Sequence, residues 1–101
     1  MNLIAGHFNN KGQSFHGNTV ETSFSKLVEI FGEPNAVCGD GKSNYIWDVL
    51  DPDNYIHGQI YDWKLYRQIE PDEIITWHIA STSINHELLI IDFINSKLSE
   101  S

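Results

Sequence analysis

The residues best suited to bind a ligand are concentrated between Ser43 and Ala80. This segment contains all three tryptophans, all four tyrosines and the only arginine of the chain. Aromatic rings offer a large contact area at little cost in entropy, and their faces attract cations. Rings together with a few cations, in a chain of net charge −8, indicate a binding face and are compatible with a small anionic ligand. The candidate ligand-binding residues are Lys42, His57, Tyr61, Trp63, Lys64, Arg67, Trp77 and His78.

One short motif resembles part of a phosphate-binding loop. Gly41-Lys42-Ser43 matches the end of that pattern, but the full pattern requires a glycine where this chain has Ala36. The pattern also requires a helix after the loop, whereas the residues that follow are typical of a strand. An ordinary turn at Asp40-Gly41 is the better interpretation, and Lys42 could still meet an anion as a point charge.

A second motif resembles a metal-dependent nuclease. Pro52-Asp53 followed by Asp62-Trp63-Lys64 loosely matches the sequence motif of such nucleases. Their active site needs two carboxylates close to one divalent ion. If one strand joins them, Asp53 and Asp62 lie roughly 30 Å apart at the usual rise of a strand. Asp48 cannot supply the second carboxylate either, because the hairpin register expected below puts it opposite His57. Only a sharp bend at Gly58 would rescue a nuclease or phosphodiesterase site.

The histidines and the single cysteine give no stronger chemistry. The five histidines show no metal-ligand spacing on one element, although His57 and His78 could bind a metal or shuttle protons if their strands align. Cys38 lies in a glycine-containing loop with no evident base, so a nucleophilic role is disfavoured. We therefore expect no catalytic residue, no metal ion and no cofactor.

Length and charge restrict the classes of partner. The 101 residues predict a single small domain, residues 1–101, with one modest core. A sequence pI of about 4.8 argues against broad contact with duplex nucleic acid, which needs a basic surface. No apolar run approaches the length of a membrane span. One cysteine and the lack of signal-peptide features at the start favour the cytoplasm.

The elements that must position the candidate residues begin with a helix. After a turn-rich N-terminal segment with short strand-like ends, apolar residues follow at helical spacing, which predicts a helix over residues 19–31. Asn18 is the expected cap, with Glu21 closing a capping box. Gly32 and Pro34 are expected to end the helix. The apolar stripe is Val20, Phe24, Leu27, Val28 and Phe31.

A hairpin is expected next, from strands at residues 44–50 and 55–66 around the turn at residues 51–54. A symmetric register pairs Val49 with Ile56, Trp47 with Gly58 and Tyr45 with Ile60. Those residues share a core face, where Gly58 leaves room for the Trp47 ring. The opposite face is mixed polar and aromatic, as expected for contact with water or a ligand. It carries Ile46, Asp48, Tyr55, His57, Gln59, Tyr61 and Trp63.

A third strand at residues 74–80 and a helix at residues 84–98 complete the fold. Alternation puts Trp77 with the core residues Ile75 and Ile79, and His78 with His57 and Tyr61 on the opposite face. Trp77 thus has two interpretations, a core residue or a ring for a ligand. The expected fold is α+β: a three-stranded antiparallel sheet, extendable to four or five strands, with both helices on one face.

The order of these motifs resembles a family of small bacteriophage proteins. The succession is Phe31-Gly32-Glu33-Pro34, Asp40-Gly41-Lys42, Trp47, the strand Ile60-Tyr61-Asp62-Trp63-Lys64 and finally Trp77-His78-Ile79. It covers residues 24–80, and Ala80-Ser81 stands where the family usually has glycines. The resemblance implies a phage accessory protein. By analogy with small acidic phage proteins, it suggests a factor that counters host defence.

Three functions are compatible with these observations. The first is a binding protein that sequesters a nucleotide-type signal, as a homo-oligomer, with rings stacking on bases and Lys42, Lys64 and Arg67 meeting phosphates. The second is an acidic phage inhibitor that docks on a basic groove of a host defence or nucleic-acid-binding protein. The third is a small metal-dependent nuclease or phosphodiesterase. The expected partner is a small anion or a host protein.

Overall fold

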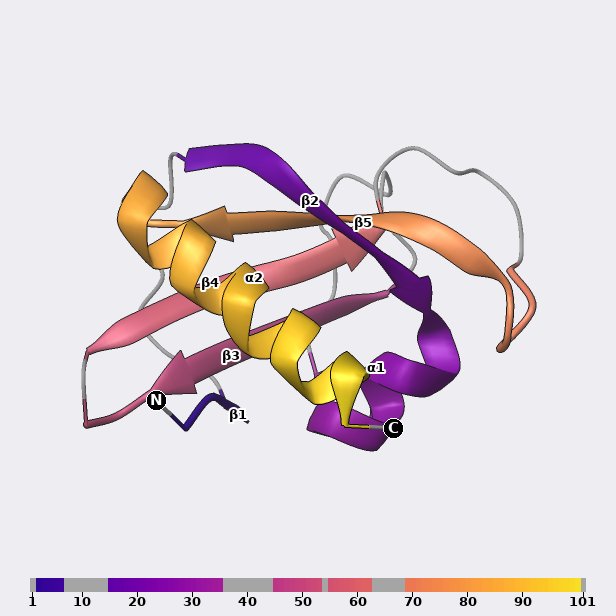
Figure 1. Cartoon of the computed structure of the whole chain (residues 1–101). Helices are drawn as coiled ribbons and strands as arrows, with labels where there is room; N and C mark the ends of the chain where they lie inside the picture. Colours follow the sequence, from indigo (N-terminus) through magenta and orange to yellow (C-terminus); the bar gives the residue numbers. More distant parts are fainter. Residues whose placement is uncertain (1, 7–14, 36–44, 54, 63–68, 101) are drawn as a thin grey trace.

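The computed structural model describes residues 2–6, 15–35, 45–53, 55–62 and 69–100. It contains a five-stranded antiparallel sheet and two helices (Figure 1). The strands are β1 (Ile4–Ala5), β2 (Phe15–Ser23), β3 (Ile46–Asp51), β4 (Ile56–Asp62) and β5 (Ile74–Ser81), in the spatial order β1-β3-β4-β5-β2. The helices are α1 (Phe24–Phe31) and α2 (Ile84–Ser99). The expected α+β class is confirmed, and the sheet has five strands, the upper end of the expected range of three to five.

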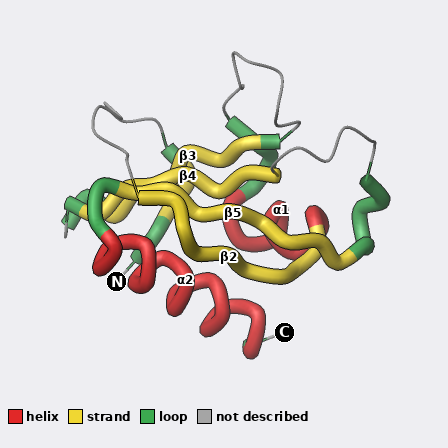
Figure 2. Tube along the Cα trace, turned by 90° about the horizontal axis from the view of Figure 1, so that it is seen from above, coloured by secondary structure: helices red, strands yellow, loops and turns green. Residues whose placement is uncertain are grey.

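Both helices pack on one face of the sheet. Figure 2 shows α2 running along one side of the strands, and the Phe24 ring of α1 contacts the rings of Tyr45 and Trp47 on that same side. Phe31 of α1 contacts Phe93 of α2. Among the described residues, no helix is long and apolar enough to span a membrane.

The expected start of the first helix is wrong. Residues 19–23 belong to β2, where Thr19 lies opposite His78 and Val20 opposite Trp77. Ser23, not Asn18, caps α1, because its side chain accepts a hydrogen bond from the Lys26 N–H. An apolar Val20 is compatible with a helix and with a strand, so the apolar pattern alone could not distinguish the two. Pairing of this segment with β5 favours the strand.

The end of α1 and the whole of α2 agree with the sequence. Gly32 follows α1 with a φ of 83°, the left-handed region that glycine tolerates best. Ser83 caps α2, because its side chain accepts a hydrogen bond from the His86 N–H. Local signals are sufficient at these helix ends because no competing strand pairing exists there.

The β3–β4 hairpin has the expected faces but another register. Val49 lies opposite Gly58 and Trp47 opposite Ile60, a shift of two residues from the expected pairs. The turn begins one residue later, because Asp51 ends β3 opposite Ile56 and its carboxylate accepts the Asp53 N–H. A shift of two preserves the alternation of side chains, so the same residues still face the helices.

The reason for Gly58 also differs from the expectation. A Cβ atom at this position would lie 2.5 Å from the Ala80 carbonyl oxygen and 2.7 Å from Cδ1 of Ile90. The missing side chain therefore admits β5 and α2, and not the Trp47 ring. Trp47 packs against Trp77 instead, with ring centroids 5.4 Å apart in an edge-to-face arrangement.

Candidate functional site

The face of the sheet that points away from both helices carries the described candidate residues that are not in the core. We call this surface the polar face and define it by Thr19, Asp48, His57, Gln59, Tyr61, Thr76 and His78. Strand register arranges these residues in rows across the sheet. Thr19, His78 and Tyr61 form one row, and Gln59 and Asp48 belong to the next. Because alternate residues of a strand point to opposite faces, the same strands also build the core beneath.

Tyr61 and His78 form the centre of the polar face. They lie opposite each other on β4 and β5, and their rings are stacked with centroids 5.7 Å apart and an interplanar angle of 25°. Both side chains are half-buried. The prediction that His78 joins Tyr61 on this face is confirmed. Two stacked rings with part of their surface accessible are suited to contact a third planar group.

The phenol of Tyr61 is neutral at physiological pH. Burial, and secondly the negative charge of Glu87, raise the pKa of Tyr61 above its usual value of 10.0. A neutral hydroxyl both donates and accepts a hydrogen bond. The Tyr61 group can therefore bind an anion or a base edge without electrostatic repulsion.

Asp48 and Gln59 form a fixed polar pair beside these rings. The Gln59 Nε2 donates to Oδ1 of Asp48 at 2.8 Å, and Asp48 is only 6% exposed. The backbone of Asp48 is held by the Asn35 side chain, whose Nδ2 donates to the Asp48 carbonyl and whose Oδ1 accepts the Asp48 N–H. Asn35 thus continues the edge of the sheet beyond β1. Sequence reasoning missed it, because a single asparagine after Pro34 gives no signal of long-range pairing.

His57 lies on the same face, away from His78. It pairs with Leu50, whereas His78 pairs with Tyr61. Residues 57 and 61 of one strand are about 13 Å apart at the usual rise. The strands therefore do not align His57 with His78, which was the condition for a metal or proton-transfer pair. Burial, and then the nearby His86, lower the pKa of His57 below 6.5. Its imidazole is therefore neutral at pH 7.

Trp77 is a core residue and is not available to a ligand. It is 0% exposed, and its Nε1 donates to the Thr22 carbonyl at 3.0 Å. Of the two interpretations offered by the sequence, the structure supports the core. The cause is strand parity, because Trp77 is adjacent to His78 and must point to the opposite face.

The nuclease motif does not assemble a metal site in the described part. Asp62 is 0% exposed and accepts the Tyr45 N–H at 2.7 Å, whereas Asp53 is exposed in the turn before β4. The two residues lie at opposite ends of β4, as the sequence predicted, and no bend at Gly58 brings them together. Across the described ranges, no three side chains of His, Cys, Asp or Glu gather closely enough to hold a metal ion.

Four candidate residues lie outside the described residues: Lys42, Trp63, Lys64 and Arg67. The last three follow Asp62, the final residue of β4, in the chain. The described site therefore consists of rings, hydroxyl and amide groups, and the nearly buried carboxylate of Asp48.

Comparisons with protein-family models, with curated proteins and with solved structures found no match to this chain. The geometry of the polar face is thus the basis for a functional assignment.

Proposed function

We propose that the protein is a non-catalytic binding protein that captures a small nucleotide-type anion on the polar face. The stacked pair of Tyr61 and His78 carries this proposal, since it presents partly accessible rings at the middle of the sheet. A base would extend the stack, and stacking on an aromatic side chain contributes about 1–3 kcal/mol per base.

Neighbouring groups support recognition of the rest of the ligand. Thr19 and Thr76 are exposed beside His78, and their hydroxyls can donate to base edges or to ribose. Lys64 and Arg67 follow β4 closely in the sequence, and arginine can bind a phosphate through two parallel hydrogen bonds. The ligand proposed is therefore one that joins a base to at least one phosphate.

The resemblance to small phage proteins supplies the biological setting. In this proposal the protein acts in the cytoplasm of an infected host, as a homo-oligomer, and removes a nucleotide signal from a defence pathway. Sequestration requires binding without turnover, and none of the described side chains is assigned a catalytic role.

Calorimetry with a panel of cyclic and linear nucleotides tests the proposal. We expect at least one nucleotide to bind, with about 5- to 150-fold weaker affinity after Tyr61→Ala or His78→Ala, because a stacking contact of about 1–3 kcal/mol is lost. Tyr45→Ala is the matched control, since Tyr45 packs against Phe24 on the helix side. The absence of both heat and thermal shift with every nucleotide would refute capture.

The second candidate function, docking on a basic surface of a host protein, is favoured by the exposed carboxylates. They are distributed over β2, the turns and the helices, where a basic groove could meet them. Native mass spectrometry of the protein with host lysate should then show a stoichiometric complex that high salt dissociates. The exposed acidic residues are Glu21, Glu29, Glu33, Asp53, Glu70, Asp72, Asp92 and Glu100.

A further inference from the structure

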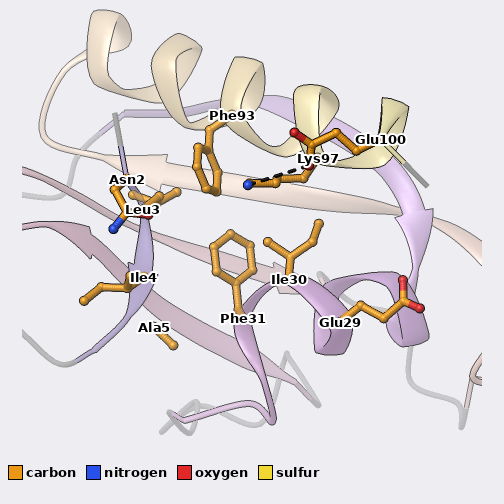
Figure 3. A pocket seen from close by; sticks show the side chains of 10 residues that line it. All are labelled: Asn2, Leu3, Ile4, Ala5, Glu29, Ile30, Phe31, Phe93, Lys97 and Glu100. Atoms are coloured by element: carbon orange, nitrogen blue, oxygen red, sulfur yellow. Dashed lines mark ion pairs between the residues drawn. The ribbon is translucent and has the colours of Figure 1, made fainter.

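An open groove of about 610 Å³ lies on the helix side of the molecule, away from the polar face (Figure 3). It is bordered by residues 2–5 at β1, by residues 29–31 at the end of α1, and by Phe93, Lys97 and Glu100 of the last turns of α2. A volume of this size is in the range of small-molecule sites.

The groove combines aromatic and aliphatic side chains with a lining that is polar over more than half of its surface. Phe31 and Phe93 approach each other from the two helices, with ring centroids 6.2 Å apart (Figure 3). Leu3 and Ile30 complete the apolar wall, and Ile4 remains 44% exposed at its border. A small apolar group can therefore cover Ile4 and the accessible parts of Ile30 and Phe93, because Leu3 and Phe31 are themselves buried.

The border of the groove favours a positive charge. Among the described lining residues are two carboxylates, Glu29 and Glu100, and one ammonium, that of Lys97. Glu29 also pairs with Lys26 at 3.4 Å, and this exposed pair, like that of Lys97 with Glu100, is weak. The C-terminal turns of α1 and α2 both reach the groove, and the C-terminal end of a helix carries a partial negative charge. The protein as a whole has a net charge of −8, which adds to the same preference.

Lys97 shows where a cation can be placed. Its Nζ lies 5.5 Å from the centroid of the Phe93 ring and 3.7 Å from Oε2 of Glu100. Figure 3 shows this side chain reaching from the end of α2 over the groove. The pair is an exposed one, with side chains 43% and 65% accessible, and such pairs break at little cost. A ligand ammonium can therefore replace Lys97 over the ring.

We propose that this groove is a binding site for a small amphipathic cation, an organic amine with an apolar body and one protonated nitrogen. The apolar body lies against the accessible edge of the Phe31–Phe93 pair and against Ile4. The nitrogen takes the place of the Lys97 ammonium near Glu100. This site is separate from the polar face and does not depend on the function proposed for it.

Three probes that share one apolar body test the site: 4-phenylbutylamine, 4-phenylbutanol and 4-phenylbutyrate. Binding is followed by two-dimensional NMR titration of the full chain, since affinities on the order of millimolar are expected for probes of this size. The amine should bind most tightly and the carboxylate most weakly, with shifts at Phe31, Phe93 and residues 2–5. Equal or tighter binding of the carboxylate, or shifts elsewhere, would overturn the proposal.

Variants of exposed residues separate the charge preference from a general effect. Glu100→Gln should weaken amine binding about two- to five-fold, the range for an exposed ion pair, whereas Asp72→Asn in a distant turn should leave it unchanged. Lys97→Ala should strengthen amine binding more than Lys26→Ala does. Both changes remove one cation that pairs with a glutamate three residues later, but only the first uncovers Phe93. Equal effects of the two lysine variants would contradict the placement of the cation over that ring.

Discussion

The two faces of the sheet are built from the same strands, yet the aromatic residues of one face are buried in the core and those of the other are partly accessible. Toward the helices, Trp47 and Trp77 are fully buried, and each indole N–H donates to a backbone carbonyl, of Gly32 and Thr22 respectively. On the polar face, Tyr61 and His78 stack on each other and stay half-buried. Strand parity alone separates rings that hold the fold from rings that can meet a ligand.

The comparison also shows what the acidic residues do. On the helix side, three buried carboxylates accept hydrogen bonds from the backbone. Asp51 accepts the N–H groups of Asn2 and Asp53. Asp62 accepts the N–H of Tyr45, and Glu87 accepts the N–H of Asn18. These carboxylates replace strand partners where the chain turns or bulges. The net charge of the chain therefore overstates the negative charge of the surface, because some of the carboxylates are buried and hold the backbone.

The largest effect is expected for Trp77→Ala. Removal of a fully buried ring should lower the free energy of unfolding by about 3–5 kcal/mol, since it leaves a cavity beside Trp47. Thr76→Ala, one residue away on the exposed face, should change it by less than about 0.5 kcal/mol. Urea denaturation followed by circular dichroism measures both. Similar losses for the two variants would break the distinction between the faces.

Glu87→Ala tests whether a buried carboxylate secures β2 to α2. Its two oxygens accept hydrogen bonds from the Asn18 N–H and from Asn18 Nδ2, where the pairing of β2 with β5 is irregular. Leaving these donors without a partner should cost about 2–3 kcal/mol. Glu87→Gln keeps one acceptor oxygen and should cost about half as much. The exposed Glu100→Gln should be nearly neutral, and a comparable loss there would argue for a general charge effect.

Gly58→Ala is expected to cost about 1–3 kcal/mol, because the added methyl group meets the Ala80 carbonyl and the Ile90 side chain. Gly17→Ala is the matched control, since nothing lies within 4 Å of the Cβ that it would add. Thermal denaturation of the two variants compares a glycine inside the packed layer with one outside it. Unchanged stability of Gly58→Ala would mean that β4 and α2 separate easily.

The sequence predicted the faces of the strands better than their partners. Burial with a period of two survives a register shift of two, so the sides of Trp47, Tyr61 and His78 were correct although the β3–β4 pairs were not. The register depends on a turn in which Tyr55 has a φ of 56°, a conformation that few non-glycine residues adopt. No local pattern indicates such a residue.

Long-range contacts were beyond prediction for a different reason. Asn18 was expected to cap the first helix, but it binds Glu87, which is 69 residues away. An asparagine before a β-branched segment fits a helix cap and a strand equally well, and only the partner decides. The half-buried rings of the candidate site were found because alternation is local, whereas Asn35, which fixes Asp48, was not.

The smallest effect concerns His57, which relates the polar face to α2 through His86. Because burial and His86 lower its pKa in the folded protein, the unfolded chain takes up the proton more readily. The stability contributed by neutral His57 is complete above pH 6.5 and is lost as the pH falls through the lower pKa of the folded state.

The measurement is the drop in melting temperature between pH 7.5 and pH 5.5. This drop should be smaller for His57→Gln than for the wild type. The side chain is half-buried and keeps part of its contact with water, so a difference of only about 1–3 °C is expected. A full 1 kcal/mol would move the melting temperature of a domain of this size by about 4–8 °C. His86→Gln removes the second cause and should leave part of the difference. A larger fall for His57→Gln than for the wild type would show that protonation of His57 stabilises the fold, and that the polar face is more electronegative than its described residues indicate.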